Sequence, residues 1–230
     1  MRLSHPLGLA ASAECVATAF LVMGVVGSGI MAERLCGGNA GLALLANAVA
    51  TVAVLFVLIL VIAPISGAHM NPCVTLTAAS VGGFAWTAVP AYVAAQVSGA
   101  ILGTVLAHGM FDVPLLQIAT RVRTGPGQWL AETVATLGLL GVIWGCRSYA
   151  APTSAGAVAV YIGGAYWFTA STSFANPAVT VARALTDSFA GIRPVDVGGF
   201  IAAQFAGAVL VAIALRRFSA RANATLEPTQ

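Results

Sequence analysis

The chain has no Asp, Glu, Lys or Arg between Arg34 and Asp112, and none between Arg147 and Arg183. Charged residues make up 7% of its 230 residues, whereas a soluble globular chain carries roughly 25%. Hydrophobic residues account for 59%. A soluble domain cannot cover its surface with so few charges, so the composition excludes a cytosolic enzyme and predicts an integral membrane protein with no enzymatic activity.

Six apolar stretches are long enough to cross a membrane, since a spanning helix needs about 20 residues for about 30 Å of hydrocarbon. They are Leu9–Met31, Gly41–Ala63, Val89–Ala107, Gln128–Trp144, Ser154–Thr169 and Val197–Leu215. Six spans occupy most of the chain and leave no room for a second, soluble domain. We therefore expect a single all-α transmembrane domain, with the lipid bilayer as its main partner.

Several features argue against other classes of site. The first nine residues lack a basic region and a small-residue cleavage site, so we expect the first span to be retained. The four cysteines show no CxxC or framework spacing, and His5 and His108 are isolated. We expect no metal site and no cofactor. The net charge of +3 is too small to indicate nucleic-acid binding.

The chain also contains an internal repeat. Three pairs of segments match in the same order, namely AECVATAF at Ala13 with AETVATLG at Ala131, NPCVT at Asn71 with NPAVT at Asn176, and YVAAQVSGAILG at Tyr92 with FIAAQFAGAVLV at Phe200. The pattern predicts a first repeat over 1–110, a second over 125–218 and a polar C-terminal tail over 219–230.

Each repeat holds three full spans and one shorter segment, 66–80 or 171–187, that is rich in Pro, Ser and Thr. An odd number of crossings inverts the second repeat in the membrane, so the short segments dip in from opposite faces. Placing the termini inside puts five arginines on the inner side, and the positive-inside rule then favours cytoplasmic termini in a cell membrane.

The two Asn-Pro pairs predict the starts of two short helices. Asn is a strong N-cap, and Pro is favoured at the first helical position. Half-helices that start near the midplane from opposite faces direct their positive dipole ends at one point, which repels protons and other cations. The alternative, two ordinary capped loop helices, does not explain the duplication.

These residues carry a family resemblance. ISGAHMNPCVT, FANPAVT, the paired AE(C/T)VAT segments and the paired AAQ-x-(S/A)-G-A segments resemble the aquaporin and aquaglyceroporin (major intrinsic protein) family across nearly the whole chain. The resemblance implies six transmembrane helices, two re-entrant half-helices, one pore in each subunit and a homotetramer. The implied pore motifs are Asn71, Pro72, Cys73, Asn176, Pro177 and Ala178, and the two Asn side chains are expected to donate hydrogen bonds to the passing solute.

Cys73 departs from the family pattern, which usually has Ala at this position. The thiol either packs as a small hydrophobic group or lies near the lumen and binds soft metals. His69, two residues before Asn71, matches a family position at the cytoplasmic pore mouth; it lines the pore or makes a buried structural hydrogen bond.

Glu14 and Glu132 occupy equivalent places inside apolar spans, where a carboxylate is costly and by default functional or paired. In the family the matching Glu accepts hydrogen bonds from backbone N–H groups of the re-entrant loop. That supporting role is the expectation, and a proton relay in a transporter is the alternative.

The family's outer filter usually carries an Arg three residues after the second Asn, where this chain has Val179. Spacing transfers the other filter positions to Thr51, Gly164 and Ser173, which together predict a wide, uncharged constriction. Arg183 follows Val179 by one helical turn. It either pairs with Asp187 or forms a vestibule charge.

The resulting hypothesis is a passive channel for water and small uncharged solutes, including glycerol-like polyols. The combination NPAVTVARALTD resembles a bacterial branch associated with arsenic resistance, which implies metalloid hydroxides such as arsenite as solutes. The alternatives are a water-selective aquaporin, an inverted-repeat secondary transporter and a structural membrane protein with a closed pore.

Overall fold

The computed structural model describes residues 5–224, with side chains through Phe218. Eight α-helices follow one another in this region, with a short 3₁₀ turn at Trp86–Ala88 and no strand. They are α1 (Leu7–Leu35), α2 (Ala40–Ser66), α3 (Pro72–Ser80), α4 (Val89–Met110), α5 (Pro126–Gly145), α6 (Ala151–Phe168), α7 (Pro177–Arg183) and α8 (Pro194–Ala224). Six long helices and two short ones confirm the predicted fold class.

The long helices coincide with the six predicted spans to within a few residues at most ends. By length and hydropathy alone, α1, α2, α4 with its preceding 3₁₀ turn, and α8 qualify as membrane-crossing helices among the described residues. The other two, α5 and α6, are shorter, at 20 and 18 residues. The largest difference is at the C-terminus, because α8 continues to Ala224. Residues 219–224 of the predicted tail therefore extend this helix, and 225–230 lie outside the described region.

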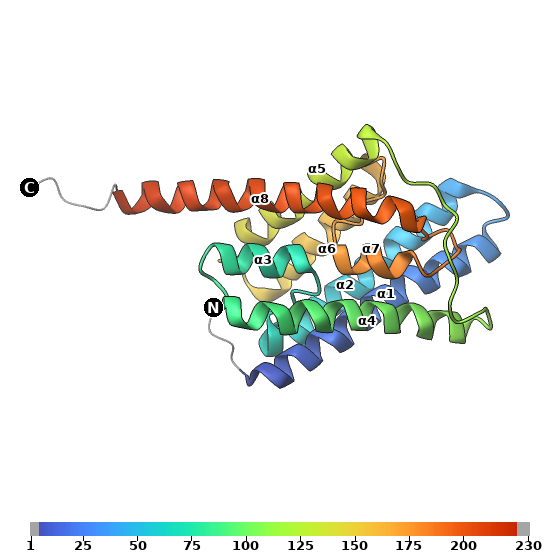
Figure 1. The fold of residues 1–230 in the computed structure, drawn as a ribbon, viewed down its shortest axis with the longest axis horizontal. Coiled ribbons are helices and arrows are strands. Elements are labelled where there is room, and N and C mark those ends of the chain that lie inside the picture. The colour runs from blue at the N-terminus through green and yellow to red at the C-terminus, as the bar shows by residue number, and fades with distance from the viewer. Residues whose placement is uncertain (1–4, 225–230) are drawn as a thin grey trace, which may run out of the picture.

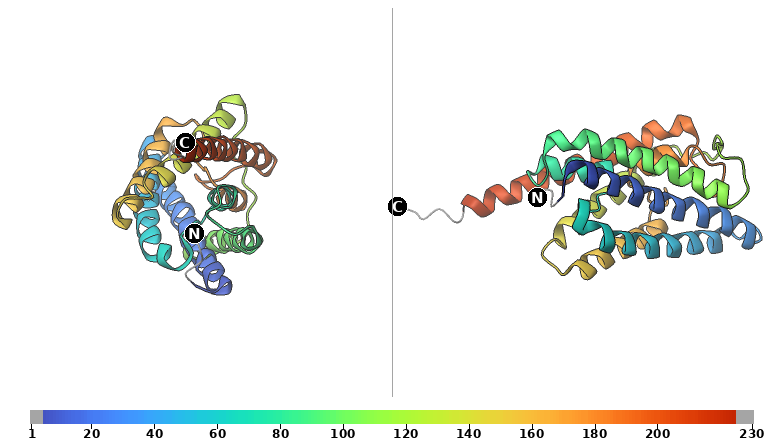
Figure 2. Two further views of the ribbon diagram at one scale, coloured as in Figure 1. Left: turned by 90° about the vertical axis from the view of Figure 1, so that its left-hand side faces the viewer. Right: turned by 90° about the horizontal axis from the view of Figure 1, so that it is seen from below.

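The long helices lie side by side along one direction (Figures 1 and 2). In chain order, each half of the molecule contributes two long helices, one short helix and a third long helix. The short helices α3 and α7 run in opposite directions away from the middle of the bundle (Figure 1). This arrangement is the geometry that an inverted repeat produces.

Glycine allows the closest helix contacts. A Cβ added to Gly103 of α4 would lie 2.2 Å from the carbonyl oxygen of Ala19 in α1, and one added to Gly99 would lie 2.1 Å from that of Cys15. In the second half, Gly207 of α8 approaches the Thr133 carbonyl oxygen of α5 in the same way, at 2.6 Å. Small residues at such crossings let backbones approach closely in a membrane, where apolar burial alone does not drive helix association.

We predict that Gly103→Ala lowers the stability of the protein by about 1–3 kcal/mol, because the added methyl group overpacks the contact with α1. Gly141→Ala in α5 is the matched control, since its Cβ would meet nothing within 4 Å. The measurement is thermal unfolding in detergent. Equal midpoints for the two variants would contradict this account of the α1–α4 contact.

Candidate functional site

The N-terminal ends of α3 and α7 meet through their capping residues. Asn71 caps α3 by accepting a hydrogen bond from the Cys73 N–H (2.8 Å), and its Nδ2 donates to the Ala175 carbonyl (2.7 Å). Asn176 caps α7 in the same way, and its Nδ2 donates to the Met70 carbonyl (2.7 Å). Each half-helix is thus tied to the loop that precedes the other one.

The loop before α3 is held by the carboxylate of Glu14, which is completely buried. Its Oε1 accepts from the backbone N–H of His69 (2.8 Å) and the hydroxyl of Ser66 (2.6 Å). Its Oε2 accepts from the backbone N–H of Met70 (2.6 Å) and from Gln96 Nε2 (2.8 Å). Four donors converge on one carboxylate, which is the loop-supporting geometry expected for this residue.

Glu132, also completely buried, makes the corresponding bonds in the second half. Its oxygens accept from the backbone N–H groups of Phe174 (2.9 Å) and Ala175 (2.8 Å) and from Gln204 Nε2 (2.6 Å). Gln204 also donates to the Thr180 hydroxyl (2.8 Å). The two halves therefore share one hydrogen-bond pattern around their loops.

The supported loops have an unusual backbone. Ala68 and Met70, three residues and one residue before Asn71, have φ values of 50° and 46°. Ser173 and Ala175 stand at the same positions before Asn176, with φ values of 51° and 49°. Left-handed conformations of this kind cost a non-glycine residue about 1–3 kcal/mol and persist only where the surroundings impose them. The carboxylates supply that constraint.

A cavity of about 480 Å³ runs beside this junction. Its wall includes residues at the C-terminal ends of both α3 and α7, helices that point in opposite directions, so the cavity follows both half-helices along the bundle. Among the described residues, two charged side chains line it, Arg147 and Arg183, and no carboxylate does. The cavity is therefore positive in sign at both of its ends.

Most of the sequence-predicted lining positions lie on this wall. The lining includes Thr51, His69, Asn71, Ser173, Asn176, Val179 and Arg183. It does not include Pro72, Cys73, Pro177 or Ala178, which are buried at the starts of the half-helices, nor the loop-supporting Glu14 and Glu132.

Gly164 is the filter position that the structure does not place on the wall. It lies on the exposed side of α6, whereas Ile162 and Tyr166 of the same helix line the cavity. Two residues of helix correspond to a rotation of about 200°, so a small error in transferred spacing moves a side chain to the opposite face. The inward face of α6 could have been found from its residues at intervals of four, namely Val158, Ile162 and Tyr166.

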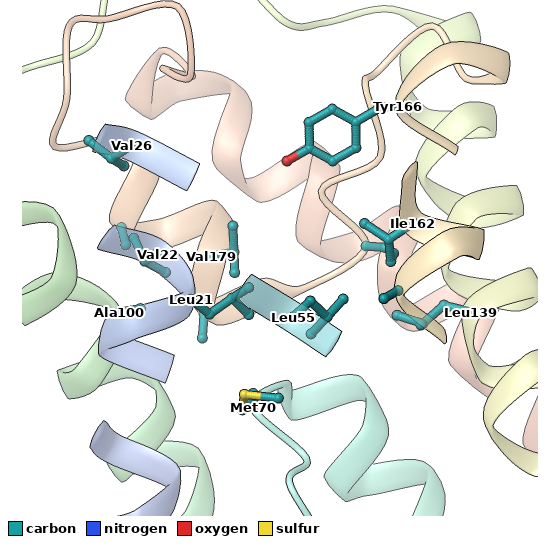
Figure 3. Close-up of a cluster of buried hydrophobic side chains, with 14 of the residues drawn as sticks. Leu21, Val22, Val26, Leu55, Met70, Ala100, Leu139, Ile162, Tyr166 and Val179 are labelled. Atoms are coloured by element: carbon teal, nitrogen blue, oxygen red, sulfur yellow. The ribbon is translucent and has the colours of Figure 1, made fainter. Parts of the chain in front are cut away.

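Tyr166 adds a polar group that the sequence analysis missed. Its hydroxyl lies 3.1 Å from the Thr51 hydroxyl, which links α6 to α2. Figure 3 shows this hydroxyl pointing inward, toward a space bordered by Leu21, Leu55 and Val179. The wall at this level therefore combines a hydroxyl pair with aliphatic side chains.

His69 fits both of the interpretations left open for it. The side chain lines the cavity, and its Nδ1 lies 3.0 Å from the Thr75 hydroxyl. Its ring packs against Phe84 and Tyr92, with centroid distances of 5.1 and 5.4 Å. Cys73 fits the packing interpretation, because it is fully buried in an apolar cluster with Val74 and Leu140.

Arg183 does not pair with Asp187. Its Nε donates to the Ala190 carbonyl, and its guanidinium carbon lies 3.3 Å from the centroid of the Phe174 ring. The carboxylate of Asp187 instead accepts from the backbone N–H and the hydroxyl of Thr120, both at 2.9 Å. The expected helix-end ion pair is therefore wrong, because the loop after α7 turns Asp187 toward the segment between α4 and α5.

A second buried arginine, Arg123, comes from the segment between α4 and α5. It donates to the carbonyls of Gly191 (2.8 Å) and Ser171 (3.0 Å), and it lies 5.0 Å from the centroid of the Phe174 ring. Burial, followed by the neighbouring positive charge of Arg183, lowers the pKa of Arg123 to about 9. The side chain therefore stays charged at neutral pH. Sequence reasoning missed it because loop residues carry no periodic signal.

The sequence profile described as Major intrinsic protein matches residues 4–170. The chain belongs to the major intrinsic protein family. It is 52% identical over 206 residues to Aquaglyceroporin AqpS of Rhizobium meliloti (strain 1021), covering 90% of this chain and 88% of the relative. It is 54% identical over 44 residues to the Glycerol uptake facilitator protein of Bacillus subtilis (strain 168), covering 19% and 16% of the two chains.

A solved structure also resembles this major intrinsic protein. The aquaglyceroporin from Plasmodium falciparum superimposes with a TM-score of 0.66 at 21% identity, covering 90% of this chain and 94% of that one. At this identity the likeness supports the fold, and the polar contacts described above come from this chain's own residues.

We predict that Glu132→Gln is tolerated better than Glu132→Leu. Gln keeps one carbonyl acceptor for the loop, whereas Leu leaves the N–H groups of Phe174 and Ala175 without an acceptor, at about 1–3 kcal/mol each. The measurement is the yield of folded protein together with its thermal midpoint in detergent. Equal behaviour of the two variants would count against the supporting role.

We also predict that Cys73→Ala does not change the response of the channel to mercurials, because the thiol is fully buried and does not line the cavity. The measurement is solute flux in proteoliposomes before and after mercury treatment. A block that disappears in Cys73→Ala would place the thiol at the lumen and contradict the packing described here.

Proposed function

We propose that this major intrinsic protein conducts glycerol-like polyols and metalloid hydroxides in addition to water, by passive flow through the cavity beside the half-helices. The chain is a channel for water and small solutes, and the choice among solutes is the subject of this proposal. The observation that carries it is the wall around Val179, which has hydroxyl groups and aliphatic groups but no filter arginine.

The polar part of that wall consists of hydroxyl groups. Thr51 and Tyr166 are hydrogen-bonded to each other, and the described residues offer the buried hydroxyl of Ser173 no partner. Each hydroxyl can both donate and accept, so together they suit a solute that carries several hydroxyl groups.

Another part of the wall is aliphatic, with Leu21, Leu55 and Val179 around the same space (Figure 3). A polyol has hydroxyl groups on one side of a carbon backbone and C–H groups on the other, so it matches both surfaces. Neutral trivalent arsenic and antimony hydroxides present a comparable spread of hydroxyl groups. These solutes fit the wall by the same chemistry.

Tyr166 modifies the expectation of a filter made of small residues only. An aromatic ring stands where the spacing argument placed a glycine, so the constriction is lined by Thr51, Tyr166, Ser173 and Val179 in this proposal. It is uncharged at Val179 and richer in hydroxyl groups than expected. A strictly water-selective filter is less compatible with the aliphatic residue at that position.

The buried carboxylates argue against a secondary transporter. Such a mechanism requires an ion site or a titrating acid on the transport path. Glu14 and Glu132 are fully engaged with loop donors, and neither lines the cavity. A fixed supporting role leaves them no part in proton transfer.

We further propose a homotetramer in the cell membrane with cytoplasmic termini. Large apolar side chains remain exposed on the long helices of the single chain, for example Val49, Val57 and Val61 on α2, which suits contact with lipid or with neighbouring subunits. Arg147, Arg216 and Arg217 would then lie on the inner side, in accordance with the positive-inside rule.

We predict that Val179→Arg sharply reduces the flux of glycerol and arsenite and reduces water flux less. The long side chain narrows the constriction for the larger solutes first, while its donors can still hydrogen-bond water. Swelling of proteoliposomes in water, glycerol and arsenite gradients measures the three fluxes.

Val179→Leu adds bulk without charge and is the steric control for this experiment. Unchanged glycerol and arsenite flux in a correctly folded Val179→Arg protein would show that position 179 does not line the constriction. The proposed solute range would then lose its main support.

A further inference from the structure

We propose that Arg183 supplies the fixed positive charge that excludes protons and other cations from this pore, in place of the arginine missing at Val179. The inference rests on the proposed channel function and adds to it the residue responsible for charge selectivity. Arg183 lies one helical turn after Val179 on the same face of α7, and both side chains line the cavity.

The guanidinium of Arg183 is held in one position. Arg183 is 2% exposed, its Nε donates to the Ala190 carbonyl, and its guanidinium carbon lies over the Phe174 ring. The backbone at Phe174 is fixed in turn by Glu132, and the Arg183 carbonyl accepts from the Ile192 N–H (3.2 Å). A charge fixed in this way acts on a passing ion without having to reorient.

Arg183 has no ion-pair partner among the described residues. Within the described residues, the one ion pair joins Arg193 to Asp196, and no hydrogen bond uses an Nη nitrogen of Arg183. A second cation, Arg123, lies at the same ring. The Glu132 carboxylate also acts on the Arg183 charge, but its oxygens are bonded to the loop donors, and no carboxylate of the described residues lines the cavity. The Nη donors are therefore available to the lumen.

Arg183 also offsets the partial negative charge at the C-terminal end of α7. The C-terminus of a helix carries a partial negative charge, which attracts cations, and α7 ends at Arg183 near one end of the cavity. A guanidinium at that point reverses the sign of the local field. In a low-dielectric constriction a fixed cation opposes the entry of another much more strongly than it does in water.

The direct test is proton flux into proteoliposomes, measured with an internal pH dye after a pH step, with valinomycin and potassium holding the membrane potential at zero. We expect Arg183→Gln to raise proton flux by about tenfold or more relative to wild type, and Arg183→Lys to raise it much less. Proton flux in Arg183→Gln equal to that of wild type would overturn the proposal.

Arg34→Gln is the matched control for the loss of one positive charge. Arg34 is exposed, does not line the cavity and donates to the Phe111 carbonyl (2.7 Å). Phe111 directly follows α4, and His108 in the last turn of α4 contacts Thr186 in the segment after α7. Arg34 therefore lies on the same side of the molecule as Arg183. We expect its loss to leave proton flux unchanged, and an increase equal to that of Arg183→Gln would overturn the assignment.

Glycerol flux in the same vesicles separates the two proposals. A wild-type protein that conducts no glycerol contradicts the proposed solute range, whatever its proton flux. A protein that conducts glycerol but has the same proton flux with and without the Arg183 charge contradicts only the present inference.

A second measurement keeps Arg183 in place, in case its replacement prevents folding. Val179→Cys introduces a thiol one turn from Arg183, and methanethiosulfonate reagents of positive, negative and zero charge are compared in their rates of modification. The rates are normalised to a free thiol and corrected for the native cysteines. We expect the anionic reagent to react about tenfold or more faster than the cationic one.

The preference should shrink at high salt because ions screen the field. Equal normalised rates for the two charged reagents would overturn the proposal. Failure of even the neutral reagent to react would remove position 179 from the lumen, and the placement of Arg183 beside it would fail as well.

Discussion

The structure depends on two carboxylates that are buried at the level of the membrane core. Each accepts hydrogen bonds from backbone N–H groups of a loop that contains residues in left-handed conformations. Without those acceptors the N–H groups would be unpaired, and nothing would offset the strain of the loop backbone. Charge burial is tolerable here because every carboxylate oxygen is satisfied. Glu14 and Glu132 thereby position the backbone that lines the pore.

The parts of this arrangement that the sequence predicted are those encoded by repetition. The duplicated Asn-Pro pairs, the paired glutamates and the apolar spans predicted the half-helices, their capping and the all-α fold, because each depends on local residue types or on a copied pattern. The predicted spans ended within a few residues of most helices. For α8 the prediction ended nine residues early, since its polar end continues as helix.

The filter was less predictable, because it depends on how far each helix is rotated about its own axis. Gly164 was expected on the wall, but Tyr166 lines it instead. Two residues along α6 rotate the side chain by about 200°, so the transferred spacing selected the wrong face of the helix. Arg123 and the contacts of Arg183 escaped prediction for a related reason. Their partners are backbone carbonyls from distant segments, and only the folded chain brings these carbonyls near the arginines.

The exchange of hydrogen bonds between the two asparagines has a consequence for biogenesis. Asn71 bonds to the carbonyl of Ala175, and Asn176 bonds to that of Met70, so neither loop is complete until both halves are present. During synthesis the first half enters the membrane before the residues that satisfy its loop have been made. Its re-entrant segment therefore has to settle late, after the second half has inserted, which makes the meeting of the two loops the closing step of folding.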